Sequence, residues 1–143
     1  MKIGLLVTAR MGSTRLHDKH LKPLLGRPAL SYLLERIENT FETPMLEGFA
    51  QVFIATGRAS GNTALGIFSN DHVRLFYGDD DNIPLRHLQL AKAHSLDAIV
   101  SIDGDDLFCS LFLWLSVSHL SAIARVSFGI GTAVWECLVL SFN

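Results

Sequence analysis

Four short apolar runs constrain the fold of this 143-residue chain more than any other feature. They cover residues 2–8, 51–56, 73–77 and 98–103, and a polar or glycine-containing loop follows each of them. Apolar runs of this length that stop at turn signals are typical of strands buried on both faces. The sequence therefore predicts four buried strands.

Segments with helical spacing separate these strands. Pro28 precedes apolar residues that recur at helical intervals, Asn62 is expected to cap a short helix that runs through Phe68, and Asn82 is expected to cap a longer helix. The apolar face of the first helix is expected at Leu30, Leu33, Leu34, Ile37 and Phe41. That of the longer helix is expected at Leu85, Leu88 and Ala91. Strands and helices that alternate through short connections predict a Rossmann-like α/β domain with a mainly parallel sheet.

The net charge of −2 hides a strong asymmetry along the chain. Residues 1–36 contain seven Lys or Arg against two Asp or Glu, whereas residues 37–110 contain four against eleven. Because no long segment is basic throughout, the sequence argues against general binding of nucleic acid. It favours a local anion site followed by a local cation site.

The loop at residues 9–22, "ARMGSTRLHDKHLK", directly follows the first predicted strand. Its cations are Arg10, Arg15, Lys19 and Lys22, and its small or hydroxyl residues include Gly12, Ser13 and Thr14. Arginine offers forked donors to phosphate oxygens, lysine a mobile point charge, and glycine a close approach to the backbone. The combination predicts a phosphate site, and the alternative is a solvated basic loop before a helix.

A second unusual loop, "DGDD" at residues 103–106, follows the fourth predicted strand. Mg²⁺ prefers carboxylate oxygens together with substrate phosphates and water. Parallel α/β sheets bind ligands beyond the carboxyl ends of their strands, so we expect both loops to share one site. For the aspartate loop taken alone, a turn with solvated carboxylates is the simpler interpretation.

Other motifs carry less information. The Walker A pattern GxxxxGK[ST] is absent, and "GIGTAV" at residues 129–134 lacks the third glycine of a dinucleotide site. The three aspartates at residues 79–81 are interpreted as a turn with a helix cap. His17 and His20 are interpreted as surface or loop residues.

The end of the chain differs from the rest. Residues 107–124 contain no charged side chain, so a buried helix is the simplest interpretation and a membrane-associated subunit the alternative. Cys109 and Cys137 show no zinc spacing. Two cysteines in a chain of this size indicate a reducing compartment more than a disulfide framework, and the start of the chain lacks a signal-peptide pattern. We therefore expect a cytoplasmic protein, with an α/β domain at residues 1–110 and an apolar tail at residues 111–143.

The stretch "ARMGSTRLHDKHLKPLLGRPAL" resembles the opening motif of the cytidylyltransferases that activate acidic sugars, such as CMP-Kdo synthetases, CMP-sialic acid synthetases and SpsF-like proteins. The family pattern A-R-x-x-S-x-R-L-x-x-K-x-L is matched at Ala9, Arg10, Ser13, Arg15, Leu16, Lys19 and Leu21. The segments at residues 54–65 and 77–106 are similar to later parts of the same family. The resemblance covers residues 1 to about 110.

This resemblance implies a nucleotide-diphospho-sugar transferase fold and the transfer of CMP from CTP to a sugar acid, with release of pyrophosphate, for surface polysaccharide synthesis. The residues that would carry the reaction are Arg15, Lys19 and Asp105, with Mg²⁺ on Asp105. The residues that would bind the nucleotide are Ala9, Arg10, Gly12, Ser13 and Lys22.

The chain also departs from the family pattern. His17 and Asp18 replace the usual Pro-Gly, and Leu107 replaces a proline. No resemblance continues past residue 110, where family members carry the sugar pocket and a dimerisation arm. We therefore expect a truncated form of the fold, with a nucleotide-binding remnant without catalysis as the alternative function. The resemblance also suggests a homodimer.

Overall fold

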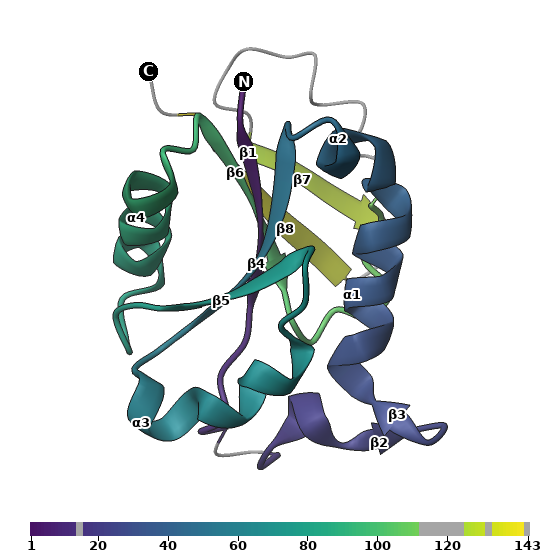
Figure 1. Cartoon of the computed structure of the whole chain (residues 1–143). Helices are drawn as coiled ribbons and strands as arrows, with labels where there is room; N and C mark the ends of the chain where they lie inside the picture. Colours follow the sequence, from purple (N-terminus) through teal and green to yellow (C-terminus); the bar gives the residue numbers. More distant parts are fainter. Residues whose placement is uncertain (14–15, 112–124, 131–132, 142–143) are drawn as a thin grey trace.

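The computed structural model describes residues 1–13, 16–111, 125–130 and 133–141. A six-stranded sheet with the order β5-β4-β1-β6-β8-β7 runs through its centre (Figure 1). The strands are β1 (Ile3–Thr8), β4 (Ala50–Thr56), β5 (Val73–Tyr77), β6 (Ala98–Asp103), β7 (Arg125–Ile130) and β8 (Ala133–Ser141). The strands β5, β4, β1 and β6 are parallel, whereas β8 pairs antiparallel with both β6 and β7. The expected α/β fold with a mainly parallel sheet is confirmed.

Each of the four predicted strands is present within one residue of its expected bounds. The strand β1 lies between β4 and β6, and its Leu5, Leu6 and Val7 are all at most 1% exposed. A strand in this position is covered on both faces, which explains why its sequence is apolar without alternation.

Helices α1 (Ala29–Thr40) and α4 (Ile83–His94) cover opposite faces of the sheet (Figure 1). The helix α1 buries the four predicted positions from Leu30 to Ile37, and Phe41 is buried just after its end. Asn82 caps α4 as expected, since its Oδ1 accepts a hydrogen bond from Leu85 N at 2.9 Å.

The apolar face predicted for α4 is partly wrong. Leu85 is 38% exposed, while the buried residues of this helix are Arg86, His87, Leu90 and Ala91. The first turns of α4 lie near the carboxyl ends of the strands, where backbone carbonyls accept hydrogen bonds from Arg86. Polar side chains therefore take the inward positions that periodicity assigns to leucine.

The remaining elements are short. They are η1 (Lys19–Leu21), β2 (Pro23–Leu24), β3 (Arg27–Pro28), α2 (Glu42–Leu46), α3 (Ala59–Asn62) and η2 (Thr63–Phe68). Asn62 does not cap a helix as predicted, because its Oδ1 accepts from Met11 N and its Nδ2 donates to Arg58 O, both at 2.9 Å. This buried amide instead fastens the first loop to the segment after β4.

Most of the predicted buried helix, residues 112–124, lies outside the described residues. Further along the apolar tail, β8 extends the sheet with Ala98 opposite Ser141, and β7 pairs with β8. Within the part of the chain that the structure describes, no helix has both the length and the hydropathy needed to cross a membrane. The domain boundary at residue 110 stays a prediction.

Candidate active site

The first loop and the aspartate loop lie side by side because their strands are neighbours. Thr8, the last residue of β1, is in register with Asp103, the last residue of β6. Across this edge Gly104 N donates to Thr8 O at 2.9 Å. Both loops therefore leave the sheet at its carboxyl edge, where folds of this kind bind their ligands.

An ion pair joins Lys19 of the first loop to Asp105 of the aspartate loop. The side chain of Lys19 is 27% exposed and that of Asp105 is 45% exposed. A pair this open to solvent adds little to stability. Both groups can consequently exchange partners, the ammonium toward a phosphate and the carboxylate toward a metal ion.

His20 lies beneath this pair, with its Nδ1 3.8 Å from Asp105 Oδ1. Its ring is 3% exposed, so His20 is not a surface residue, although it does belong to the first loop as expected; His17 is exposed as expected. Burial lowers the pKa of His20, and the nearby Asp105 carboxylate offsets this only in part. The ring is thus uncharged at neutral pH and supports the loop by packing.

Gly104 fits the narrow space between the two loops. A Cβ at this position would lie 2.8 Å from Thr8 O and 3.1 Å from His20 Cε1. Because Thr8 O belongs to the backbone of a central strand, it has little freedom to move away. Only glycine therefore allows the aspartate loop to pack this closely against β1.

Three of the predicted nucleotide-binding residues are exposed at this edge, namely Arg10, Gly12 and Lys22. A Cβ at Gly12 would meet no atom within 4 Å, so the backbone here is open to a ligand. Arg15, predicted to be catalytic, lies outside the described residues, as does Thr14. The role of Arg15 therefore stays a prediction.

Ala9 is bonded to the neighbouring strand β4, and Ser13 is bonded within the first loop. Ala9 is buried, and its N–H donates to Ala55 O at 3.3 Å. The Ser13 hydroxyl accepts from Leu16 N at 3.4 Å. These bonds fix the path of the loop, while direct contacts of either residue with a nucleotide remain predictions.

Arg36 on α1 supports the segment that follows the aspartate loop, and this role is not predicted from the sequence. Arg36 donates from Nη2 to Cys109 O at 2.8 Å and from Nη1 to Leu107 O. Burial raises the pKa of the nearby Asp106 carboxyl. The only signal in the sequence is one arginine on the polar side of an amphipathic helix, which carries no information about its partner.

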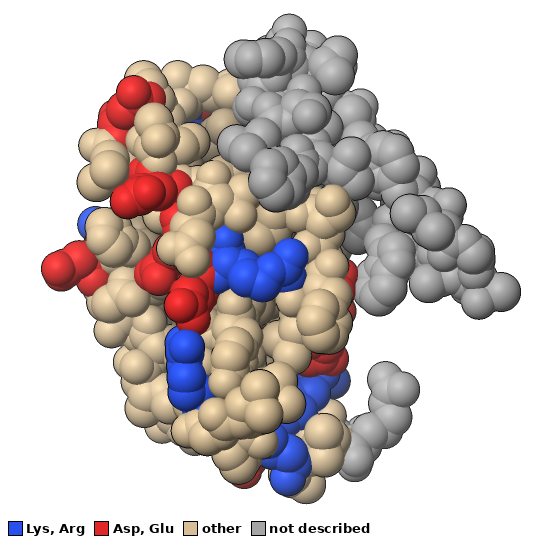
Figure 2. Space-filling view, turned by 90° about the vertical axis from the view of Figure 1, so that its right-hand side faces the viewer, with Lys and Arg blue, Asp and Glu red and all other residues tan. Residues whose placement is uncertain are grey.

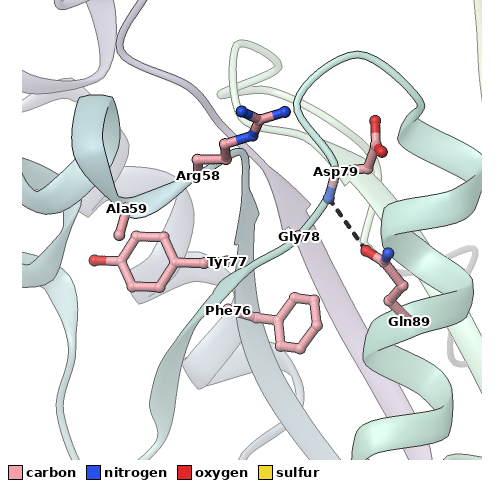
Figure 3. A pocket seen from close by; sticks show the side chains of 7 residues that line it. All are labelled: Arg58, Ala59, Phe76, Tyr77, Gly78, Asp79 and Gln89. Carbon is pink, nitrogen blue, oxygen red and sulfur yellow. Dashed lines mark hydrogen bonds between the residues drawn. The ribbon is translucent and has the colours of Figure 1, made fainter.

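An open pocket of about 480 Å³ lies beside the carboxyl end of β5 (Figure 3). It is lined by Arg58, Ala59, Phe76, Tyr77, Gly78, Asp79 and Gln89. Figure 3 shows Tyr77 pointing toward Ala59 and Phe76 pointing the other way, toward α4. None of these residues is predicted from the sequence to bind a ligand, because isolated aromatic and basic residues form no motif.

The three consecutive aspartates form the turn that their sequence predicts. Asp79 Oδ1 accepts from Asp81 N at 3.1 Å and from Asn82 N at 2.8 Å. Asp80 binds Arg58, with its Oδ2 2.9 Å from Nε and its Oδ1 accepting from the backbone N–H at 2.6 Å. The turn therefore fixes one cation at the rim of the pocket.

Basic and acidic side chains are interspersed on the face of the molecule shown in Figure 2. Among the described residues on this face, no continuous basic surface is present. A nucleic-acid duplex would require such a surface. The face shown therefore gives no support for bulk binding of nucleic acid.

The described residues include no cluster of three or more His, Cys, Asp or Glu that could hold a metal ion by itself. Asp105 offers one exposed carboxylate, and its N–H donates to Asp103 Oδ1 at 3.2 Å. Mg²⁺ is commonly bound by one or two carboxylates, with substrate phosphates and waters completing its shell. The residues therefore fit a divalent cation that arrives with a nucleotide.

We expect His87 to make stability depend on pH. Its Nε2 lies 3.3 Å from Thr8 Oγ1, and burial, assisted by the charge of Arg86, lowers its pKa to about 4. Between about pH 6.5 and 4 the unfolded chain binds a proton at this histidine that the folded chain does not. The free energy of unfolding is therefore highest above this window and falls as the pH drops through it. The loss should reach about 2 kcal/mol near pH 5.

Urea unfolding of the wild type and the His87→Gln variant at about pH 7.5 and 5 measures this effect. His20 titrates in the same direction, so the difference between the two proteins isolates His87. An equal loss of stability in both proteins would contradict the assignment.

The fold is that of the α/β nucleotidyltransferases, and it places a cation loop and a carboxylate loop at adjacent strand ends. The family model described as "Cytidylyltransferase" matches residues 5–111. The chain therefore belongs to the cytidylyltransferase family.

Solved structures share this fold. A cytidylyltransferase from Leptospira borgpetersenii is 24% identical with a TM-score of 0.70, and the match covers 99% of this chain and 60% of that one. CMP:2-keto-3-deoxy-manno-octonic acid synthetase in complex with CTP is 21% identical with a TM-score of 0.65, and the match covers 86% of this chain and 50% of that one. A Mycobacterium tuberculosis H37Rv protein in complex with manganese is 20% identical with a TM-score of 0.57, and the match covers 82% of this chain and 58% of that one. The chain thus spans only 50–60% of the length of these proteins.

Proposed function

We propose that the protein transfers CMP from CTP to a sugar acid and releases pyrophosphate, as a cytoplasmic step toward a surface polysaccharide. The observation that carries the proposal is the contact between Lys19 and Asp105, which brings the cation loop and the carboxylate loop to one point of the sheet edge. Membership of the cytidylyltransferase family supports the choice of nucleotide.

In this proposal the first loop holds the triphosphate. The exposed Arg10 and Lys22, together with Arg15, would bind the β- and γ-phosphates that leave as pyrophosphate. The sugar hydroxyl attacks the α-phosphorus in line with the departing oxygen, and the bridging bond to the β-phosphate breaks. Lys19 stabilises the negative charge that develops on the leaving group.

Asp105 is the residue that would hold the divalent cation. When bound, Mg²⁺ would offset negative charge on the phosphate oxygens. Lys19 binds one carboxylate oxygen of Asp105, and the other lies 3.8 Å from His20 Nδ1. Because the side chain as a whole is 45% exposed, the carboxylate is open to an incoming ion. The neutral His20 ring beneath it excludes water from that side.

The nucleoside would extend from the first loop toward the pocket beside β5. Arg10 is close enough to the buried Arg86 to influence its pKa, and Arg86 lies directly under the turn that forms the pocket rim. Tyr77 and Phe76 offer aromatic surface to a base, and the exposed Arg58 offers donors. The sugar acid and a homodimer interface would depend on residues beyond those matched by the family.

The proposal is tested by measuring pyrophosphate release from CTP in the presence of Mg²⁺ and a panel of sugar acids that includes 2-keto-3-deoxy-manno-octonic acid. We expect release to require both the metal and one sugar acid, and to fall at least about tenfold when UTP replaces CTP. Equal release from UTP and ATP would contradict the choice of nucleotide.

The second candidate is a nucleotide-binding remnant without catalysis. The observation behind it is that the family model stops matching at residue 111, although the chain continues beyond that residue. Calorimetry separates the two candidates: binding of Mg·CTP without pyrophosphate release for any sugar acid of the panel would favour the remnant.

A further inference from the structure

Among the residues whose burial the structure describes, Arg86 is the largest side chain that is fully buried, with 1% of its surface exposed. It lies in the first turn of α4, beneath the turn formed by residues 78–82. Taking a guanidinium out of water is costly unless its donors are satisfied. A buried arginine at the edge of a ligand site therefore indicates that its hydrogen-bond geometry is needed there.

The fork of Arg86 binds backbone carbonyls. Nε donates to Asp79 O at 2.7 Å, Nη2 to Asp80 O at 2.8 Å and Nη1 to Ala55 O at 3.5 Å. A Cβ at Gly78 would approach Arg86 Cγ to 2.7 Å, so the turn is packed directly onto this side chain. Arg86 thus fixes the path of the turn at two successive peptide units.

From these carbonyls the contacts continue to both sides of the candidate site. The Asp80 carboxylate binds the Nε and the backbone N–H of Arg58, whose side chain is 79% exposed at the pocket rim. The Ala55 carbonyl also accepts from Ala9 N, at the start of the first loop. One buried side chain therefore connects the first loop, the segment after β4 and the turn after β5.

We propose that Arg86 is a positioning residue that holds Asp80, and through it Arg58, in the geometry that binds the nucleoside end of CTP. This inference rests on the proposed function. Arg86 does not touch the nucleotide itself, because its side chain is buried and its donors are used by backbone carbonyls.

Lysine cannot replace arginine in this role. Its single ammonium keeps the charge but cannot reach two successive carbonyls and a third across the sheet edge with fixed geometry. The Arg86→Lys variant should therefore bind Mg·CTP about tenfold more weakly, because the loss of one hydrogen bond to a charged group typically weakens an interaction by about this factor. The kcat at saturating CTP should stay within about twofold of the wild type, since Arg86 contributes to binding of the ground state and transition state alike.

The experiment measures the Kd for Mg·CTP by calorimetry, the KM and kcat for pyrophosphate release, and the Tm of each variant. Asp80→Asn tests the same chain of contacts at another residue. Because the Asp80 side chain is 40% exposed, the fold should tolerate this substitution. Its affinity for Mg·CTP should fall by a similar factor. The Arg86→Lys/Asp80→Asn double variant should bind no more weakly than the worse single variant, because both act through one contact chain.

Arg74→Lys is the matched control, since Arg74 is exposed on β5 outside the candidate site. Its Kd should equal that of the wild type. If Arg86→Lys lowers only the Tm while the Kd is unchanged, or if the two losses add in the double variant, the inference is refuted and the proposed function stands. If the wild type itself does not bind Mg·CTP, the proposed function is refuted, and the inference with it.

Discussion

The Asp105→Asn variant is expected to lose about 10²–10³ in the rate of pyrophosphate release from CTP, by analogy with the removal of one charge-stabilising group from other active sites. The substitution keeps the size of the side chain but removes its negative charge. Neutral amide oxygen is a weak ligand for Mg²⁺, so the affinity for the metal should fall. Because the carboxylate is 45% exposed, the fold should tolerate the change.

The metal dependence of the rate is the decisive measurement for Asp105. A titration with Mg²⁺ should show half-saturation at a higher metal concentration in the variant than in the wild type. Asp71→Asn is the matched control, because Asp71 is exposed just before β5, at the opposite edge of the sheet. An unchanged rate and an unchanged metal titration in Asp105→Asn would exclude a metal site at this residue.

The sheet could be predicted from the sequence because a buried parallel strand has a direct signature. Each of the four parallel strands is an apolar run that ends within one or two residues of a glycine or a charged loop. The meeting of Lys19 and Asp105 follows from a topological rule, since parallel strands present their carboxyl ends at one edge. Both predictions use only local pattern and general connectivity.

Features that depend on tertiary partners could not be predicted in this way. Arg86 and His87 occupy inward positions of α4 because they form hydrogen bonds there with backbone carbonyls and with a threonine hydroxyl. The periodicity of apolar residues in a sequence gives no information about such partners. Asn62 spaces like a helix cap but binds Met11 and Arg58 instead. Antiparallel β8 depends on β6 and β7 for its pairing, and the glycines at residues 129 and 131 are interpreted from the sequence only as part of a rejected dinucleotide motif.

The variant Lys19→Ala should reduce pyrophosphate release by about 10²–10³, comparable to the loss of one donor that stabilises developing charge. Lys19 begins the single turn η1, which follows Asp18 in a left-handed conformation with φ of 52°. This turn directs the ammonium toward Asp105 rather than toward solvent. Lys19→Arg should retain part of the activity, because it keeps the charge with a different donor geometry, and Lys92→Ala, at an exposed site on α4, should have no effect.

A double-mutant cycle with Asp105→Asn decides what Lys19 does. If Lys19 only neutralises the carboxylate, its removal should cost nothing once Asp105 has lost its charge. If its ammonium turns to the leaving phosphates, the two losses should combine, and Lys19→Ala should still lower kcat in the Asp105→Asn background. We expect the second result, because the ion pair seen here is open to solvent on both partners and is too weak by itself to explain a cation placed at the junction of the two loops.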